Sequence, residues 1–400
     1  KSRPRRLAPA IPHSALRIPQ LLLPWFATAA RDLPWRRTLD PYAIWVSEIM
    51  LQQTQVKTVI PYWERWLREL PDVAALAAAP EQRLLKLWEG LGYYTRVRNL
   101  QKAAQHIVAR HRGVFPRDFP AILELPGVGR YTAGAICSIA FNQPTPILDG
   151  NVIRVLTRVF GIAENPREAK TNARLWLLAE NLVGRAKNAK PAKGNSASPA
   201  SRPSRDANYC SQFNQSLMEL GALVCTPQQP RCDACPVRAL CVARRDGLVA
   251  ELPNLAPRAT TTRREFHAFV IEHAGKFLVT RRPAGVVNAG FWEFPNREVT
   301  TPPIAPAASL EELLHTSAPC EPLCEVKHSI TRYRITLRAF HVRATKRPAG
   351  LDAGFHWMTL PALHALPFTS AHKRILARLE AGAVPKAAVT AGTGAGRSSS

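Results

Sequence analysis

The sequence predicts two folded parts, a mostly helical N-terminal domain and a smaller α+β domain after it. From about residue 20 to 185 the chain reads as short helices joined by tight turns, and sustained strand alternation is absent. Around residues 252–264 the composition shifts to Pro, Thr and Arg, which is typical of a linker. Beyond it, residues 332–343 alternate strictly, and one face of this strand carries Tyr333, Ile335, Leu337 and Ala339.

The helical part has several recognisable boundaries. Asp40-Pro41 predicts a helix start, with Asp as the N-cap and Pro in the first turn, and the segment through Leu70 follows. Residues 185–208 are rich in Ala, Pro, Ser, Lys and Arg and bury too little apolar surface to order, so we predict a disordered insertion. A helix then resumes through residues 213–223. Further helices are expected near residues 72–78, 80–89, 95–111, 118–124, 130–141, 149–160 and 167–183.

The C-terminal part begins with a predicted hairpin. Residues 266–273 and 276–281 are strand-like, with Ala274-Gly275 at the turn. Helices near 309–316 and 369–381 complete an α+β domain. The expected organisation is a disordered basic arm at 1–19, a helical domain at 20–250, a linker at 251–264, the α+β domain at 265–382 and a disordered tail at 383–400.

The charge of the chain is strongly basic. Lys and Arg number 54 against 29 acidic residues, a net charge of +25, which suits nucleic acid first and an acidic membrane surface second. The basic stretch before Asp32 ends in an apolar run at 21–27, a pattern shared with signal peptides; we favour a solvated arm followed by the first helix. No apolar run approaches the ~18 to 20 residues that span a bilayer, so we expect no membrane association.

Four of the eight cysteines crowd into seventeen positions, Cys225, Cys232, Cys235 and Cys241. A chain of 400 residues needs no disulfide staples, so a shared metal centre is the better interpretation. Four thiolates serve either tetrahedral zinc or an iron–sulfur cluster, and the spacing does not separate the two. Either centre would fold this loop-rich segment rather than catalyse, and the arginines at 231, 238, 244 and 245 could present charge to phosphates.

A Gly-x-Gly turn lies between two predicted helices, at Gly127, Val128 and Gly129. Glycine permits close backbone approach and positive φ. Turn amides and the N-terminus of the next helix form a cradle suited to a DNA phosphate. The alternative is a plain helix–turn–helix connection.

Two carboxylates stand in unusual places. Glu48 lies in an apolar helical stretch, where partial burial would raise its pKa and keep a proton available for general-acid work. Asp149 precedes Gly150 and Asn151; an Asp before a helix is commonly only an N-cap. Cleavage of a glycosidic bond needs such a pair, one group to protonate the leaving base and one to stabilise the sugar cation.

Together these motifs resemble a known family. Residues 45–56, 90–94, 125–134 and 148–151 and the four-cysteine segment are similar to the helix-hairpin-helix DNA glycosylases, specifically the adenine-specific MutY family, over about residues 20–250. The resemblance implies a [4Fe–4S] cluster on the four cysteines, closing a helix-hairpin-helix glycosylase fold. It also implies that Glu48 protonates adenine and that Asp149 faces the sugar, with Asn151 and Tyr131 supporting the site.

The same resemblance implies the binding residues. The pocket for a flipped-out adenine would be lined by Arg31, Leu33, Trp35, Arg36, Val56 and Glu219. Trp35 and Val56 on their own would be read as ordinary core. Gln53, Leu91 and Tyr93 resemble residues that wedge into the duplex beside oxidised guanine. Helix packing is the plainer interpretation for Tyr93 and Tyr94, and only one of them need touch DNA.

The related endonuclease III branch shares this fold and cluster spacing. It carries a Lys that forms a Schiff base where this chain has Tyr131. Without that amine a lyase step has no evident nucleophile. We therefore expect base removal alone, by a monofunctional glycosylase.

The C-terminal part resembles the Nudix-like domain of the same family. Residues 290–295 fit the approach to a Nudix box, but the spaced glutamates that hold Mg²⁺ do not follow, so nucleotide hydrolysis is not expected. In the family a Phe-Ser-His loop reads the oxidised guanine; here residues 328–333 carry Ile330, Thr331 and Arg332 instead. Thr331 keeps a hydroxyl for a base edge, and Arg332 suits phosphate.

The expected function is hydrolytic excision of adenine mispaired with 8-oxoguanine or guanine in double-stranded DNA. The alternative from another class is a DNA-binding module without catalysis, which the charge and the hairpin alone would permit. Glu48 and Asp149 in register with the other motifs favour the enzyme. We expect a monomer that works beside the genome, in a bacterial cytoplasm or in a eukaryotic nucleus or mitochondrion.

Overall fold

The computed structural model describes residues 17–187, 209–256, 260–299, 304–330, 332–348, 351 and 354–381. Contacts divide the chain into two compact units. The first unit comprises Lys1–Ala79 with Thr95–Pro257, and the second comprises Pro80–Tyr94 with Arg258–Ser400. Most of the predicted basic arm and of the 185–208 insertion, Thr331 and the predicted tail lie outside the described residues.

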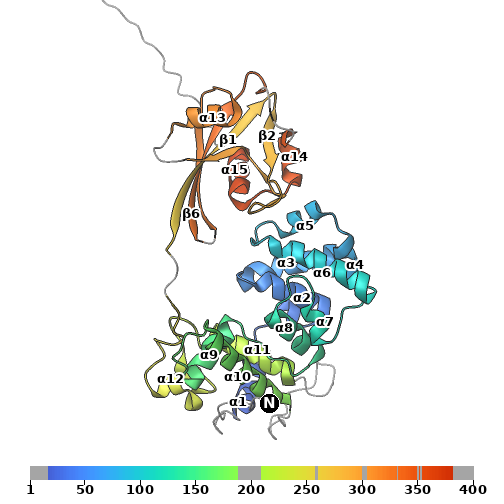
Figure 1. Cartoon of the computed structure of the whole chain (residues 1–400), viewed down its shortest axis with the longest axis vertical. Coiled ribbons are helices and arrows are strands. Elements are labelled where there is room, and N and C mark those ends of the chain that lie inside the picture. Colours follow the sequence, from blue (N-terminus) through green and yellow to red (C-terminus); the bar gives the residue numbers. More distant parts are fainter. Residues whose placement is uncertain are drawn as a thin grey trace, which may run out of the picture. The chain divides into compact units, whose positions relative to one another are not determined.

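The first unit is helical, as predicted (Figure 1). Short 3-10 turns lie at Pro34–Arg36, Cys232–Ala234 and Arg238–Leu240. The helices are α1 (Ile18–Ala29), α2 (Pro41–Leu51), α3 (Val56–Glu69), α4 (Val73–Ala78), α6 (Thr95–His111), α7 (Phe119–Leu123), α8 (Arg130–Phe141), α9 (Gly150–Phe160), α10 (Ala169–Lys187), α11 (Tyr209–Leu223) and α12 (Val242–Arg245).

Local chemistry sets the helix boundaries that matter for the site. The Asp40 carboxylate accepts hydrogen bonds from the amides of Tyr42 and Ala43, so the predicted cap of α2 is confirmed. The segment from Asp40 to Leu70 is two helices, because the chain turns between α2 and α3 where Gln53 takes a φ of 59°. Buried side chains of α1, α8, α9, α10 and α11 then form one apolar core, with Phe213 and Leu217 of α11 among its members.

The second unit is a seven-stranded mixed sheet with helices (yellow to red in Figure 1, with α5 in blue). Its strand order is β3-β2-β1-β6-β5, with β4 pairing β1 and β7 pairing β2. Its elements are α5 (Glu81–Trp88), β1 (Thr262–His273), β2 (Lys276–Arg281), β3 (Trp292–Glu293), β4 (Asn296–Glu298), α13 (Pro306–Leu314), β5 (Glu321–Ile330), β6 (Tyr333–Arg343), β7 (Phe355–Thr359), α14 (Leu360–Ala365) and α15 (Ser370–Glu380).

The sheet has an apolar core on each face. Val270 of β1 and Leu337 of β6 pack in the cluster that includes Ile375 of α15. The alternate residues Phe269 and Phe340 pack in the cluster that includes Leu310 of α13. Because successive side chains of a strand point to opposite faces, these two clusters place α15 and α13 on opposite sides of the sheet.

Sequence patterns predicted three of the seven strands, β1, β2 and β6, and misplaced one boundary. The β1–β2 hairpin is confirmed, with His273 paired to Lys276 and positive φ at Ala274 and Gly275. Residues 262–264, predicted as linker, begin β1, because they pair in parallel with β6 residues distant in sequence. Strand β5 was not predicted; a register shift between Pro322 and Cys324 interrupts its alternation.

Within the described ranges, no helix is both long enough and apolar enough to cross a membrane.

Candidate active site

The first unit contains a cavity of about 430 Å³ into which several helices project side chains. The four predicted catalytic residues, the six predicted adenine-pocket residues and Gln53 all line it. The remaining lining residues are Ile44, Ser47, Leu51, Gln52, Thr54, Ile139, Gly150, Gln215, Met218 and Ala222. Residues that are up to 188 positions apart in sequence thus meet around one space.

Glu48 is the buried acid of this cavity. It is 6% exposed and lies on helix α2, whose residues from Tyr42 to Met50 are all buried. Its Oε2 accepts a hydrogen bond from the Tyr131 hydroxyl at 2.7 Å. Burial raises the pKa of Glu48 to about 7; the nearby charge of Asp149 adds to this rise, while Tyr131 and Arg36 oppose it. A large fraction of Glu48 therefore carries a proton at neutral pH, as a general acid requires.

Asp149 caps helix α9 and also lines the cavity. Its Oδ1 accepts from the Val152 amide at 2.7 Å, which is the ordinary N-cap contact. Its Oδ2 accepts from Asn151 Nδ2 at 2.9 Å. Burial raises the pKa of Asp149, and the hydrogen bonds from Val152 and Asn151 oppose that rise. The cap interpretation of Asp149 is confirmed, and its role as a site residue stays a prediction.

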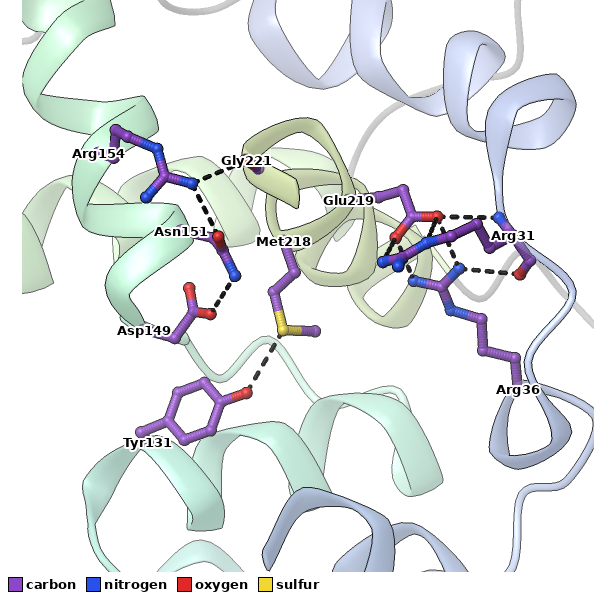
Figure 2. A network of polar contacts seen from close by, with 9 residues as sticks. All are labelled: Arg31, Arg36, Tyr131, Asp149, Asn151, Arg154, Met218, Glu219 and Gly221. Carbon is purple, nitrogen blue, oxygen red and sulfur yellow. Dashed lines mark hydrogen bonds and ion pairs between the residues drawn. The ribbon is translucent and has the colours of Figure 1, made fainter. Parts of the chain in front are cut away.

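Asn151 is fixed by a second layer of contacts (Figure 2). Its Oδ1 accepts from Nη2 of Arg154 at 2.8 Å, and the same guanidinium donates to the carbonyls of Gly221 and Cys225, each at 2.7 Å. Arg154 thereby ties the Asp149–Asn151 pair to helix α11 and to the start of the cysteine segment. The orientation of the Asn151 amide is thus set by contacts on both of its ends.

Glu219 forms the polar wall of the cavity, and Figure 2 shows its carboxylate in contact with two arginines. It is fully buried, and its carboxylate accepts from Arg31 at 2.7–2.9 Å and from Arg36 at 3.0–3.1 Å. Burial alone would raise the pKa of Glu219, but these hydrogen bonds outweigh it and hold the pKa at about 2. Unlike Glu48, Glu219 is therefore ionised at every physiological pH.

The apolar wall comes from the N-terminal turns. Trp35 is 7% exposed, with its ring edge-on to Trp63 at 6.0 Å, and it lines the cavity as well. Leu33 and Val56 complete this wall. Trp35 is packed as a core residue, and the same side chain also lines the cavity. An apolar wall with a few fixed polar groups is the usual lining for a flat organic ligand.

The predicted hairpin is present. Helix α7 ends at Leu123 and α8 begins at Arg130, and the turn between them holds Gly127 at a φ of 78°. A Cβ on Gly127 would lie 2.6 Å from the side chain of Asn99, so the turn needs glycine there for space as well as for conformation. Gly129 is the N-cap of α8, the helix expected to meet phosphate at its N-terminus, and a Cβ on Gly129 would meet nothing within 4 Å.

The four clustered cysteines line a single small cavity beside α9 and α11. All four are free thiols. Arg158 Nη1 donates to the Cys225 sulfur at 3.4 Å and to the Thr226 carbonyl at 2.8 Å. No three His, Cys, Asp or Glu side chains within the described ranges are placed to hold a single metal ion.

Comparison with known proteins identifies the family. Residues 46–181 match the model of the HhH-GPD superfamily base excision DNA repair protein, and residues 267–378 match the NUDIX domain. The chain is 36% identical to the adenine DNA glycosylase of Rattus norvegicus and 35% identical to that of Homo sapiens. Each alignment covers 88% of this chain, with 76% of the rat protein and 72% of the human protein.

The chain belongs to the adenine DNA glycosylase family. A bacterial member, from Buchnera aphidicola of Acyrthosiphon pisum, is 36% identical over 66% of this chain and 69% of its own length. The helix-hairpin-helix glycosylase fold with a Nudix domain is confirmed, and this glycosylase is an enzyme of base excision repair.

Two residues of this glycosylase site escaped the sequence patterns. Arg154 looks like any helical arginine in sequence, although it is 9% exposed and bonds Asn151, Gly221 and Cys225. Gly221 looks like a helix-weakening glycine, yet a Cβ there would lie 2.5 Å from Asn151 Cβ. One sequence signal was available for Arg154: it lies among apolar residues of the predicted helix at 149–160. A charged residue on a buried helix face needs polar partners.

Two predicted DNA contacts of the second unit do not line the cavity. Leu91 and Tyr93 belong to the second unit, where Leu91 is 6% exposed and Tyr93 is 58% exposed. Of the two adjacent tyrosines, Tyr93 is therefore the one available to a partner, since Tyr94 is only 5% exposed. Thr331, the predicted lesion contact, lies outside the described residues, between the ends of β5 and β6.

Proposed function

We propose that this glycosylase is monofunctional and removes adenine opposite 8-oxoguanine or guanine from duplex DNA by hydrolysis. The observation that carries the mechanism is the pairing of unlike carboxyl groups in one cavity. Glu48 is protonated to a large extent at neutral pH, while Asp149 is fixed by its cap contacts and Asn151. Glycosidic cleavage uses two carboxyl groups in different environments, one that protonates the leaving group and one that stabilises the sugar cation.

In the proposed reaction an adenine nucleotide enters the cavity from the duplex. Glu48 transfers its proton to a ring nitrogen of adenine as the bond from the sugar to the base breaks, and the bonding electrons leave with the base. The positive charge that develops on the sugar faces the Asp149 carboxylate. Water then adds to the sugar carbon and gives up its proton, so the products are free adenine and an abasic site. Tyr131 holds Glu48 by its hydroxyl and offers no amine, so no lyase step follows.

Glu219 supports adenine as the excised base. A permanently ionised carboxylate accepts hydrogen bonds and donates none. The exocyclic amino group of adenine is a donor, whereas the corresponding atom of guanine is a carbonyl oxygen. A guanine in the same orientation would set its carbonyl against the carboxylate, so this wall selects for adenine.

The donor set of the cysteine cavity fits an iron–sulfur cluster. Four free thiols share one cavity, and a guanidinium donates to one of them. Cys225, Cys232, Cys235 and Cys241 would be the ligands of the proposed [4Fe–4S] cluster. The cluster would stabilise this segment rather than take part in the reaction. Arg154 and Arg158 would offset the negative charge of its thiolates from the protein side.

The partner in this proposal is double-stranded DNA carrying an A:8-oxoG or A:G mispair. The basic charge of +25 and the hairpin amides supply contacts to phosphate. Recognition of the oxidised guanine is assigned to Thr331, which lies in sequence between β5 and β6. We propose that the protein acts as a monomer, away from membranes, beside the genome of a bacterial cytoplasm or a eukaryotic nucleus or mitochondrion.

A panel of duplexes tests this function. Each duplex carries A:8-oxoG, A:G, A:C or an oxidised pyrimidine, and the products are analysed with and without heating in alkali. We expect free adenine from the first two duplexes and strand breaks only after alkali. Release of oxidised pyrimidines alone, or strand breaks without alkali, would contradict the proposal and place the activity with bifunctional enzymes.

A further inference from the structure

Helix α5 and the turn after it are part of the same compact unit as the sheet, although in sequence they lie between α4 and α6. The turn, Gly90–Tyr94, follows α5 directly. Gly90, Gly92 and Tyr93 have φ of 105°, 71° and 48°. A tyrosine in the left-handed region is strained, so the surroundings must hold this turn in place.

The first end of the turn is held by a buried carboxylate. Glu89 is 5% exposed, and its Oε1 accepts from the backbone amide of Phe368 at 2.8 Å. Its Oε2 accepts from Lys373 Nζ at 2.6 Å and lies 3.3 Å from Lys86 Nζ. Phe368 lies just before α15, and Lys373 lies in its first turn. The Glu89 carboxylate therefore lies at the N-terminus of that helix. Helix dipole and lysine both favour a negative charge there.

The second end of the turn is held by aromatic packing. The Tyr94 ring lies 4.0 Å, centroid to centroid, from that of Phe291, which is fully buried beside β3. The Tyr94 hydroxyl lies 3.4 Å from the Ser370 hydroxyl at the first residue of α15. Both ends of the turn are thus attached to one corner of the sheet domain, and between them Tyr93 is presented to solvent.

We infer that Phe291 and the N-terminal turn of α15 hold the Gly90–Tyr94 turn in the conformation that lets Tyr93 insert into the duplex. The ion pair between Glu89 and Lys373 is the polar contact that fixes this turn, and we call it the anchor. The inference rests on the proposed function, in which Tyr93 wedges beside the mispair. Lys373 and Glu89 are positioning residues, because they reach DNA only through the turn. The Nudix domain then contributes to base removal by holding a segment of the glycosylase sequence, besides any reading of the lesion.

A double-mutant cycle tests the anchor. Lys373→Met removes the charged donor, so the buried Glu89 carboxylate loses one of its partners. Such a loss typically changes an equilibrium constant by about tenfold. We expect the single-turnover rate of adenine release from an A:8-oxoG duplex to fall by about tenfold. In a Tyr93→Ala background the same change should have little further effect, because the two act through one turn. Lys373→Arg should restore the rate.

The controls separate this role from general stability. Lys346→Met removes another exposed lysine of the same unit and should leave the rate unchanged. Thermal unfolding of each variant reports folding. The inference is overturned if Lys373→Met behaves like Lys346→Met, or if its full effect persists in the Tyr93→Ala background.

A second readout keeps this test independent of the proposed function. A 2-aminopurine base beside the mispair fluoresces when binding unstacks it, whether or not adenine is released. The wild-type release of adenine decides the proposed function, and the coupling between Lys373 and Tyr93 in fluorescence decides the inference. Coupling without adenine release would refute the function alone; adenine release with additive fluorescence changes would refute the anchor alone.

Discussion

Gly221→Ala is the substitution that most sharply tests how the helices build this site. The added Cβ would lie 2.5 Å from Asn151 Cβ and 3.0 Å from its Cα and carbonyl oxygen. Two of these three atoms are backbone, so α9 and α11 must separate rather than a side chain rotate. Overpacking of this kind costs about 1–3 kcal/mol, and for a domain of this size each kcal/mol lowers Tm by roughly 2–4 °C.

The same displacement should reach the chemistry. Asn151 holds Asp149 through a 2.9 Å hydrogen bond and is held by Arg154, which also bonds Gly221. A shift of about 1 Å at such a group can cost about 100-fold in rate. We therefore expect a large loss in the single-turnover rate of adenine release, with duplex affinity changed much less.

Gly184→Ala is the matched control. Gly184 lies in α10, and a Cβ there meets nothing within 4 Å. Alanine at an open helical position stabilises by up to about 1 kcal/mol, so this variant should be as active as the wild type and at least as stable. Both variants are measured by thermal unfolding and by adenine release. Equal behaviour of Gly221→Ala and Gly184→Ala would refute the close helix contact as a determinant of the site.

Four further predictions follow from the structure. Because the pKa of Glu48 is raised to about 7, its acid form is lost as pH rises through that value; kcat/KM should fall above about pH 7, and a flat profile to pH 9 would contradict the assignment. Tyr131→Phe removes a hydrogen bond that lowers the pKa of Glu48, so the falling limb of the surviving activity should move to higher pH; a shift to lower pH would refute that contact. Glu219→Gln leaves two arginines facing a neutral amide. It should lower the free energy of unfolding, measured by denaturation, by about 2 kcal/mol or more, and it should weaken discrimination against guanine, measured with a duplex that carries guanine in place of adenine. Unchanged stability would argue against the ion pairs of Glu219 with the two arginines. The purified holoprotein should absorb near 400 nm, and Cys235→Ser should lose that absorbance together with thermal stability; retained absorbance would exclude Cys235 as a ligand.

The sequence was most informative where chemistry departs from local expectation. Glu48 in an apolar helix and Asp149 before a glycine pointed to paired carboxylates, and the structure places both on one cavity. The cap at Asp40, the glycine turn at 127–129 and the β1–β2 hairpin follow from local rules that need no distant partner.

What sequence patterns missed depends on contacts between distant segments. Strand β5 and the first residues of β1 exist because β6 pairs with both. Arg154 and Gly221 matter because α9 and α11 touch, which no local periodicity shows. The attachment of Glu89 to α15 joins positions 284 residues apart, and nothing near Glu89 in sequence indicates it.

The central claim, that Glu48 is the acid that drives base removal, is tested most directly by Glu48→Gln. The amide keeps the shape of the side chain but has no acidic proton, and general-acid catalysis is worth roughly 100- to 10,000-fold. Single-turnover release of adenine from an A:8-oxoG duplex should fall at least about 100-fold, while duplex affinity and Tm stay close to those of the wild type. Glu64→Gln, an exposed position on α3, serves as the control. Turnover by Glu48→Gln at the wild-type rate would contradict the mechanism.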